Sequence, residues 1–125
     1  MADDRVLRII RNGHGRPELI LAGEIDEFSY PDLTASLVKA AGAGPGDLHV
    51  DLGAVEYCDI AGLRAIVCAT GSPGQARPGQ RVVLHSVPPQ LRKVLRILGW
   101  DALPAVVVEE ARPTGSRPAA DAAAG

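Results

Sequence analysis

The chain has 125 residues, 46% apolar and 22% charged, so it is long enough to form one compact domain without disulfides or metal ions. Its aromatic content of 3% argues against a surface that stacks nucleic-acid bases. The net charge of −2 hides an asymmetry: residues 1–62 hold eleven acidic and five basic side chains, whereas residues 63–125 hold four and eight. A surface with both signs favours a protein partner over nucleic acid.

No run of about 18 apolar residues is present, so we expect no membrane span. The charged start of the chain lacks the apolar region of a signal peptide, and we expect a cytoplasmic protein. Cys58 and Cys68 have neither Cys-x-x-Cys nor Cys/His spacing. We therefore expect reduced, buried thiols rather than a disulfide or a zinc site.

The first predicted elements form a hairpin. Residues 5–11 place apolar side chains among arginines and are typical of a strand, and residues 12–15 (Asn-Gly-His-Gly) supply a turn. Residues 18–22 are the expected partner strand. Tyr30-Pro31-Asp32 then starts a helix, because proline suits the first helical position, and the glycine-rich run 42–46 ends it.

Strands and helices alternate along the rest of the chain. The apolar periodicity predicts strands at 47–52, 80–85 and 103–109, and helices at 60–70 and from Pro88-Pro89 to Leu98, where Gly99 ends the last one. The order β-β-α-β-α-β-α-β predicts a mixed α/β fold, a mostly parallel sheet with an antiparallel N-terminal hairpin and helical cover. We expect the domain to span residues 5–110 and the Pro-, Gly- and Ala-rich tail, 111–125, to be disordered.

The segment from His49 to Val67, HVDLGAVEYCDIAGLRAIV, carries the most information. It resembles the signature of STAS domains, the family of the bacterial anti-sigma factor antagonists, in which a strand ending in Asp-Leu leads to Asp-Ser-x-Gly-Leu at a helix start. Here the matching residues are Val50-Asp51-Leu52 and Asp59-Ile60-Ala61-Gly62-Leu63. Further similarity lies in Gly23-Glu24-Ile25-Asp26 and in the helix followed by Gly99-Trp100.

Ile60 stands where this family carries its phosphoacceptor serine. A phosphate there would be held by the free N–H groups of the helix start and would repel a docking partner. Isoleucine has no hydroxyl, so the resemblance implies that this switch is absent. The domain is then either a permanently unphosphorylated-like binder or a degenerate scaffold that competes with phosphorylatable relatives.

The helix that begins at Ile60 is apolar on nearly every side, with Arg64 as its only charge. One side of such a helix is expected to be covered by a partner. We predict a partner-binding set of Asp26, Asp59, Ile60, Ala61, Gly62, Arg64, Val67 and Cys68. Ordinary core packing is an equal alternative for Val67 and Cys68.

Other chemistries receive little support from the sequence. The acidic residues Glu24, Asp26, Glu27, Asp51, Glu56 and Asp59 are expected to gather at strand ends, where capping and solvation explain them better than a metal site. The histidines, at 14, 49 and 85, look scattered, and no nucleotide-binding motif occurs. We expect no catalytic residues, no metal and no cofactor.

Hydroxyl groups away from the matched position are possible substitutes as phosphoacceptors, although caps and loops account for them better: Ser29, Thr34, Ser36, Thr70 and Ser72. The resemblance implies a protein partner such as a kinase-type anti-sigma factor, whose capture releases a sigma factor. Two alternatives stay open: a structural subunit of a transporter, including lipid transporters, and a small-ligand sensor. The oligomeric state, monomer or weak dimer, is not determined by the sequence.

Overall fold

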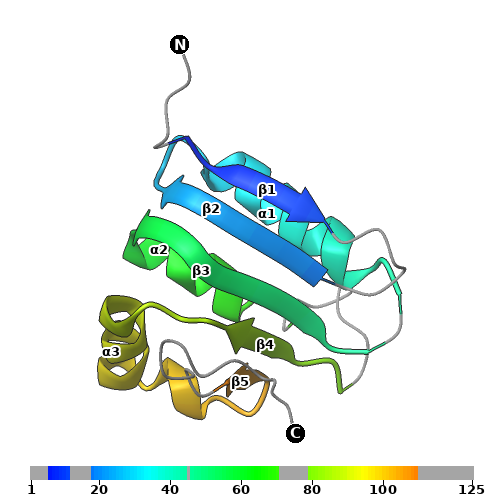
Figure 1. The fold of residues 1–125 in the computed structure, drawn as a ribbon. Helices are drawn as coiled ribbons and strands as arrows, with labels where there is room; N and C mark the ends of the chain where they lie inside the picture. Colours follow the sequence, from blue (N-terminus) through cyan, green and yellow to red (C-terminus); the bar gives the residue numbers. More distant parts are fainter. Residues whose placement is uncertain (1–5, 12–17, 45, 71–78, 110–125) are drawn as a thin grey trace, which may run out of the picture.

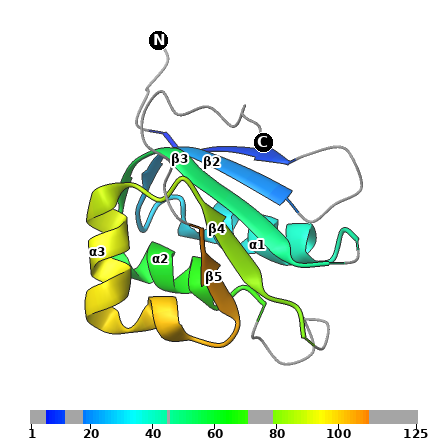
Figure 2. The ribbon, with the colours of Figure 1, turned by 60° about the horizontal axis from the view of Figure 1, so that its bottom comes forward.

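A five-stranded sheet with three helices packed against one of its faces forms the protein (Figures 1 and 2). This computed structural model describes residues 6–11, 18–44, 46–70 and 79–109. Its elements are β1 (Arg8–Arg11), β2 (Glu18–Ile25), α1 (Tyr30–Ala41), β3 (Leu48–Cys58), α2 (Ile60–Val67), β4 (Val82–His85), α3 (Pro89–Leu98), the 3-10 helix η1 (Trp100–Ala102) and β5 (Val106–Val108).

The strands lie in the order β1-β2-β3-β4-β5. β1 pairs with β2 in antiparallel register, and all other neighbours are parallel. Parallel neighbours require crossover connections, and the three helices provide them. The predicted fold class and the predicted order of elements are both confirmed.

The core lies between the sheet and the helices. Alternate strand residues point toward the helices because side chains along a strand alternate between its two faces. The largest fully buried side chains are Leu19, Leu21, Ile25, Leu33, Leu37, Leu48, Leu52, Leu63, Ile66, Leu84, Leu95 and Val50. Every strand from β2 to β4 and every α-helix contributes to this set, so the domain has a single core.

Several boundaries differ from the sequence-based expectation. The expected strand 47–52 continues to Cys58, because β2 also continues, to Ile25, and the two strands stay paired through two register shifts. α2 ends at Val67 rather than at residue 70. β5 is only Val106–Val108, because residues 103–105 form a turn in which the N–H of Val106 donates to the carbonyl of Leu103. The expected turn at 12–15 and the tail 111–125 lie outside the described residues.

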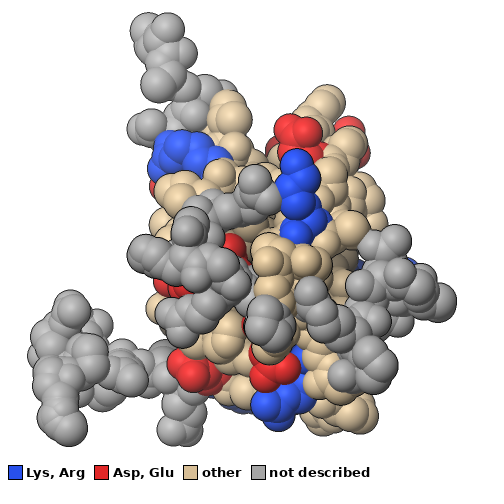
Figure 3. All heavy atoms as spheres, turned by 90° about the vertical axis from the view of Figure 1, so that its right-hand side faces the viewer, with Lys and Arg blue, Asp and Glu red and all other residues tan. Residues whose placement is uncertain are grey.

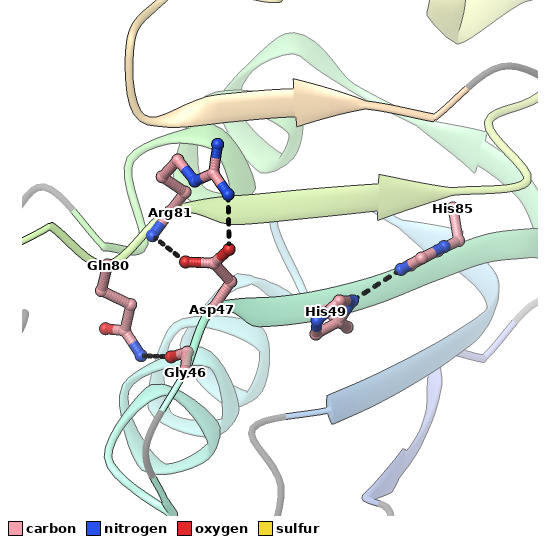
Figure 4. A network of polar contacts seen from close by, with 6 residues as sticks. All are labelled: Gly46, Asp47, His49, Gln80, Arg81 and His85. Atoms are coloured by element: carbon pink, nitrogen blue, oxygen red, sulfur yellow. Dashed lines mark hydrogen bonds and ion pairs between the residues drawn. The ribbon is translucent and has the colours of Figure 1, made fainter.

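Two polar contacts join the amino-terminal ends of β3 and β4 (Figure 4). The buried side chain of Gln80 donates from Nε2 to the carbonyl oxygens of Ala41 and Gly46, at 2.9 Å each. Asp47 accepts from the backbone N–H of Arg81 at 2.9 Å and from its guanidinium at 3.0 Å. These bonds place the end of α1 and the starts of two strands together.

Within the described ranges, no helix is both long and apolar enough to cross a bilayer.

Candidate partner-binding site

The start of α2 is held by an aspartate cap and a glycine. Asp59 precedes the helix with an extended backbone, and its Oδ1 accepts a hydrogen bond from the backbone N–H of Gly62 at 2.8 Å, as expected for an N-cap. A side chain at position 62 would overlap the Cγ2 methyl of Ile25. Glycine therefore allows the first turn of α2 to rest directly on β2.

The turn between β2 and α1 lies beside that helix start. Asp26 Oδ1 accepts from the backbone N–H groups of Phe28 and Ser29, at 3.0 and 3.2 Å. In return, the hydroxyl of Ser29 accepts from the N–H of Asp26 at 3.0 Å. The N–H of Asp59 donates to the carbonyl of Ile25 at 3.1 Å, which joins this turn to the start of α2. Both loops are thus rigidly placed at the carboxyl ends of β2 and β3 (Figure 1).

The predicted partner-binding residues divide into a surface group and a supporting group. Ile60 is 59% exposed, and Ala61, Arg64 and Cys68 are also exposed. Val67 is only 4% exposed and belongs to the core, and Gly62 is buried beneath the first turn. Asp26 and Asp59 are half-buried and use their carboxylates in the turns described above. Val67 therefore offers no contact area, which agrees with the core alternative.

Both cysteines are free, but they lie in different environments. Burial, together with the neighbouring charge of Asp59, raises the pKa of Cys58 to about 12. The Cys58 thiol donates to the carbonyl of Asp59 at 3.4 Å. Cys68 is exposed, so the expectation that both thiols are buried is wrong for this residue, which lies on the outer side at the end of α2.

Sequence reasoning missed the exposed aromatic side chains near the same edge of the sheet. Phe28 is 84% exposed on the β2–α1 turn, and Tyr57 is 53% exposed near the end of β3. Together with Ile60 they give the carboxyl edge an apolar character. The signal was present in the sequence, because the only phenylalanine of the chain stands in the loop between Asp26 and the start of a helix.

A groove of about 480 Å³ opens between β1, the end of β2 and the first turn of α1. Its apolar lining comes from Val6, Leu7, Ile9 and Phe28, and its polar lining from Glu24, Asp26, Ser29 and Asp32. The chain can come this close because Gly23 has a positive φ of 98° and lies directly against the carbonyl of Val6. The groove therefore combines apolar side chains with carboxylates in its lining.

The sequence had suggested that the three histidines are scattered, but two of them lie next to each other in the structure. His49 Nδ1 lies 2.8 Å from His85 Nε2 (Figure 4). His85 Nδ1 in turn lies 2.9 Å from Glu109 Oε1. Their neighbours along the strands point into the core, so this row of side chains lies on the sheet face that the helices leave open. His14, the third histidine, lies outside the described residues.

The acidic residues serve as caps and turn acceptors where the structure describes their contacts. No group of three or more His, Cys, Asp or Glu side chains that could hold a metal ion occurs in the part of the chain that the structure describes. On the side shown in Figure 3, acidic and basic side chains lie next to one another and neither sign forms a continuous patch. The start of α2 is instead capped by Asp59 and carries the exposed apolar side chain of Ile60.

These features define a mixed α/β domain that carries an exposed apolar residue, Ile60, at the carboxyl edge of its sheet. A family model described as "Mlab, STAS domain" matches residues 11–109. The chain belongs to the STAS domain family.

Solved structures with the same fold include an anti-sigma factor antagonist from Mycobacterium paratuberculosis. It is 21% identical, with a TM-score of 0.61 over 82% of this chain and 86% of that one. The anti-sigma factor antagonist SpoIIAA in its unphosphorylated form is 15% identical, with a TM-score of 0.59 over 86% and 90% of the two chains. The phosphorylated form of SpoIIAA, a Bacillus cell fate determinant, is 16% identical, with a TM-score of 0.57 over 84% and 92%. A search among curated proteins finds no significant match.

Proposed function

We propose that this protein is a non-catalytic regulator that captures a kinase-type anti-sigma factor in the cytoplasm through the surface around Ile60. The observation that carries the proposal is the place of Ile60, 59% exposed at the first position of α2 and directly after the Asp59 cap. The likeness of the fold to two anti-sigma factor antagonists supports the choice of partner.

The contact surface has an apolar centre with one cation beside it. Ile60 and Ala61 form the tip of α2, and Arg64 follows one turn later on an exposed position. Cys68 extends this side of the helix. Asp26, Asp59 and Gly62 hold the two turns in place, and Val67 anchors the helix from below. A partner that covers the tip would shield an apolar side chain from water, which is the main source of affinity at the centre of protein interfaces.

The same surface lacks the means for a phosphate switch. SpoIIAA is described in unphosphorylated and phosphorylated forms. Here the side chain at the matched position is a hydrocarbon that cannot accept a phosphoryl group. Of the two hypotheses for Ile60, we favour a binder that stays permanently in the binding-competent state over a degenerate scaffold, because Ile60 offers exposed apolar surface without charge.

Ile60→Asp tests the surface, with Ile10→Asp as the matched control. The two isoleucines are 59% and 54% exposed, but Ile10 lies on the edge strand β1. Partners retained from a lysate are identified by mass spectrometry, and the affinity of the purified partner is then measured by calorimetry. We expect Ile60→Asp to weaken binding by about 30-fold or more, the effect of removing an interface anchor, and Ile10→Asp to leave it unchanged. Equal affinities for both variants would refute the site. Capture of a transporter subunit would instead support the alternative that stayed open in the sequence.

Ile60→Ser tests the missing switch. With the captured kinase and ATP, the native protein should take up no phosphate in α2, whereas Ile60→Ser should be phosphorylated on the new hydroxyl and then released. Phosphate found on the native α2 segment by mass spectrometry would contradict the proposal.

A further inference from the structure

The groove beside the β2–α1 turn has the chemistry of a socket for an apolar side chain flanked by cations. Three carboxylates, from Glu24, Asp26 and Asp32, lie among its lining residues, and among the described residues no basic side chain lines it. Its apolar lining residues are three aliphatic side chains and Phe28. An apolar ligand group would bury hydrocarbon there, and adjacent positive charges would meet the three carboxylates.

Phe28 adds an aromatic side chain to the lining of this groove. Its backbone N–H is bonded to Asp26 Oδ1 at 3.0 Å, within a turn that the hydroxyl of Ser29 also closes. The ring is nevertheless 84% exposed. The turn fixes the backbone of Phe28, and its exposed ring offers apolar area for a ligand to cover, which makes Phe28 a suitable anchor.

The outer face of α3 carries the complementary chemistry. Arg96 and Ile97 lie three and four residues after Lys93, so all three side chains share one side of the helix. All three are exposed, and Ile97 is 72% exposed. The core contacts of α3 are made by Leu91 and Leu95 on the opposite side. An exposed isoleucine next to two cations fits a groove with apolar and acidic lining residues.

The two surfaces belong to opposite edges of the sheet. The groove is built on β1 and β2, whereas α3 leads from β4 to β5 at the other edge (Figure 1). One copy of the chain therefore cannot place its own α3 in its own groove.

We propose that the acidic groove of one copy binds the α3 face of a second copy, with Ile97 in the groove and Lys93 and Arg96 toward Glu24 and Asp32. This contact joins two different surfaces, so each pair of copies keeps one free groove and one free α3 face. Association of this type continues into chains, or closes into a ring if the rotation allows. The proposal is independent of the anti-sigma factor, because it needs only this chain.

Analytical ultracentrifugation of two complementary variants tests the arrangement. Phe28→Asp damages the groove and keeps α3, whereas Ile97→Asp damages α3 and keeps the groove. The native protein should form species larger than a dimer at high concentration, and added salt should weaken them. Each variant alone should dissociate about 30-fold more readily. An equimolar mixture should form a one-to-one dimer and no larger species, because only one intact groove and one intact α3 face are present per pair.

Val38→Asp is the matched control, since Val38 is 49% exposed on α1 and belongs to neither surface. It should associate as the native protein does, and circular dichroism should show that all variants are folded. A native protein that stays monomeric would overturn the proposal, and so would a mixture that forms no dimer. Binding of the monomer to anionic lipid vesicles, lost in Ile97→Asp, would assign the α3 face to a membrane and would also overturn it. Ile60→Asp should leave self-association unchanged, so failure of this proposal and failure of the proposed function are distinguishable.

Discussion

Replacement of Gly62 by alanine tests the packing that positions the partner-binding surface. The added Cβ would overlap the Cγ2 methyl of Ile25 and would lie 3.1 Å from Asp59 Oδ1, the oxygen that caps α2. Ile25 is fully buried in β2, so its methyl has no free space to enter. Either β2 and α2 separate slightly or the cap hydrogen bond is distorted.

Two opposing effects set the size of the change. Overpacking a dense core costs about 1–3 kcal/mol, whereas replacing a helical glycine by alanine contributes about 0.5–1 kcal/mol of stability. The steric cost is the larger effect, so we expect Gly62→Ala to lower the free energy of unfolding by about 1–2 kcal/mol. Urea titration followed by circular dichroism and by the fluorescence of the single tryptophan measures this difference.

Gly42→Ala is the matched control, because a Cβ at position 42 meets its nearest atom at 3.7 Å and the residue has a negative φ of −90°. It should be neutral or slightly stabilising. Ile25→Leu removes the Cγ2 methyl, so the double variant with Gly62→Ala should lose less stability than the sum of the two single variants. A stability of Gly62→Ala equal to or above that of the native protein would refute the steric argument.

Four further predictions concern individual side chains. Iodoacetamide at mildly alkaline pH should label Cys68 and spare Cys58 until the protein unfolds, as mass spectrometry would show, because the pKa of Cys58 is raised to about 12. Since the thiol of the unfolded chain ionises near its ordinary value of 9.0, this group should make the free energy of unfolding fall as pH rises from there toward 12. Gln80→Leu removes two donated hydrogen bonds and should cost about 1–3 kcal/mol in urea unfolding, and an effect near zero would contradict the bridging role. Asp59→Ala should lower the free energy of unfolding by about 1 kcal/mol, and Asp59→Asn should lower it much less, because asparagine can also accept the capping hydrogen bond. Equal losses in the two variants would show that the negative charge of Asp59, and not this hydrogen bond, stabilises the helix start.

The fold was predictable because each element carries its own periodic pattern. Leu91, Leu95 and the residues between them show a helical repeat, and turn residues separate the strands. The length of β3 was not predictable, because pairing beyond Leu52 depends on the matching extension of β2. Local sequence also indicated the cap at Asp59, since a side-chain acceptor and its N–H donor lie only three residues apart.

Features built from distant segments escaped sequence analysis. The groove joins β1 to a turn about twenty residues away, and only the paired strands bring those parts together. His49 and His85 are 36 residues apart along the chain. The parallel register of β3 and β4 sets Asp51 opposite His85, and His49 lies two residues before Asp51 on the same face of the sheet, which brings the two rings together. The exposure of Cys68 depends on which side of α2 faces the sheet, and a helix that is apolar nearly all round does not reveal this.

The row formed by His49, His85 and Glu109 has a defined direction of proton donation. An ionised carboxylate only accepts hydrogen bonds, so Glu109 Oε1 at 2.9 Å requires the proton of His85 to be on Nδ1. Nε2 of neutral His85 then carries a lone pair, and His49 must donate to it from Nδ1 across 2.8 Å. The central residue of the row makes two hydrogen bonds, and His49 makes one of them.

Replacement by leucine should therefore have unequal effects. His85→Leu removes both bonds and His49→Leu removes one, at about 0.5–1.5 kcal/mol each and nearer the lower value for these solvent-accessible groups. The ring stacking, with centroids 5.0 Å apart, is lost in both variants and does not affect the comparison. Urea unfolding should show a loss about twice as large for His85→Leu, and nitrogen-detected NMR should find the proton of neutral His85 on Nδ1. A proton on Nε2, or a greater loss from His49→Leu, would show that the carboxylate does not set the direction of the row.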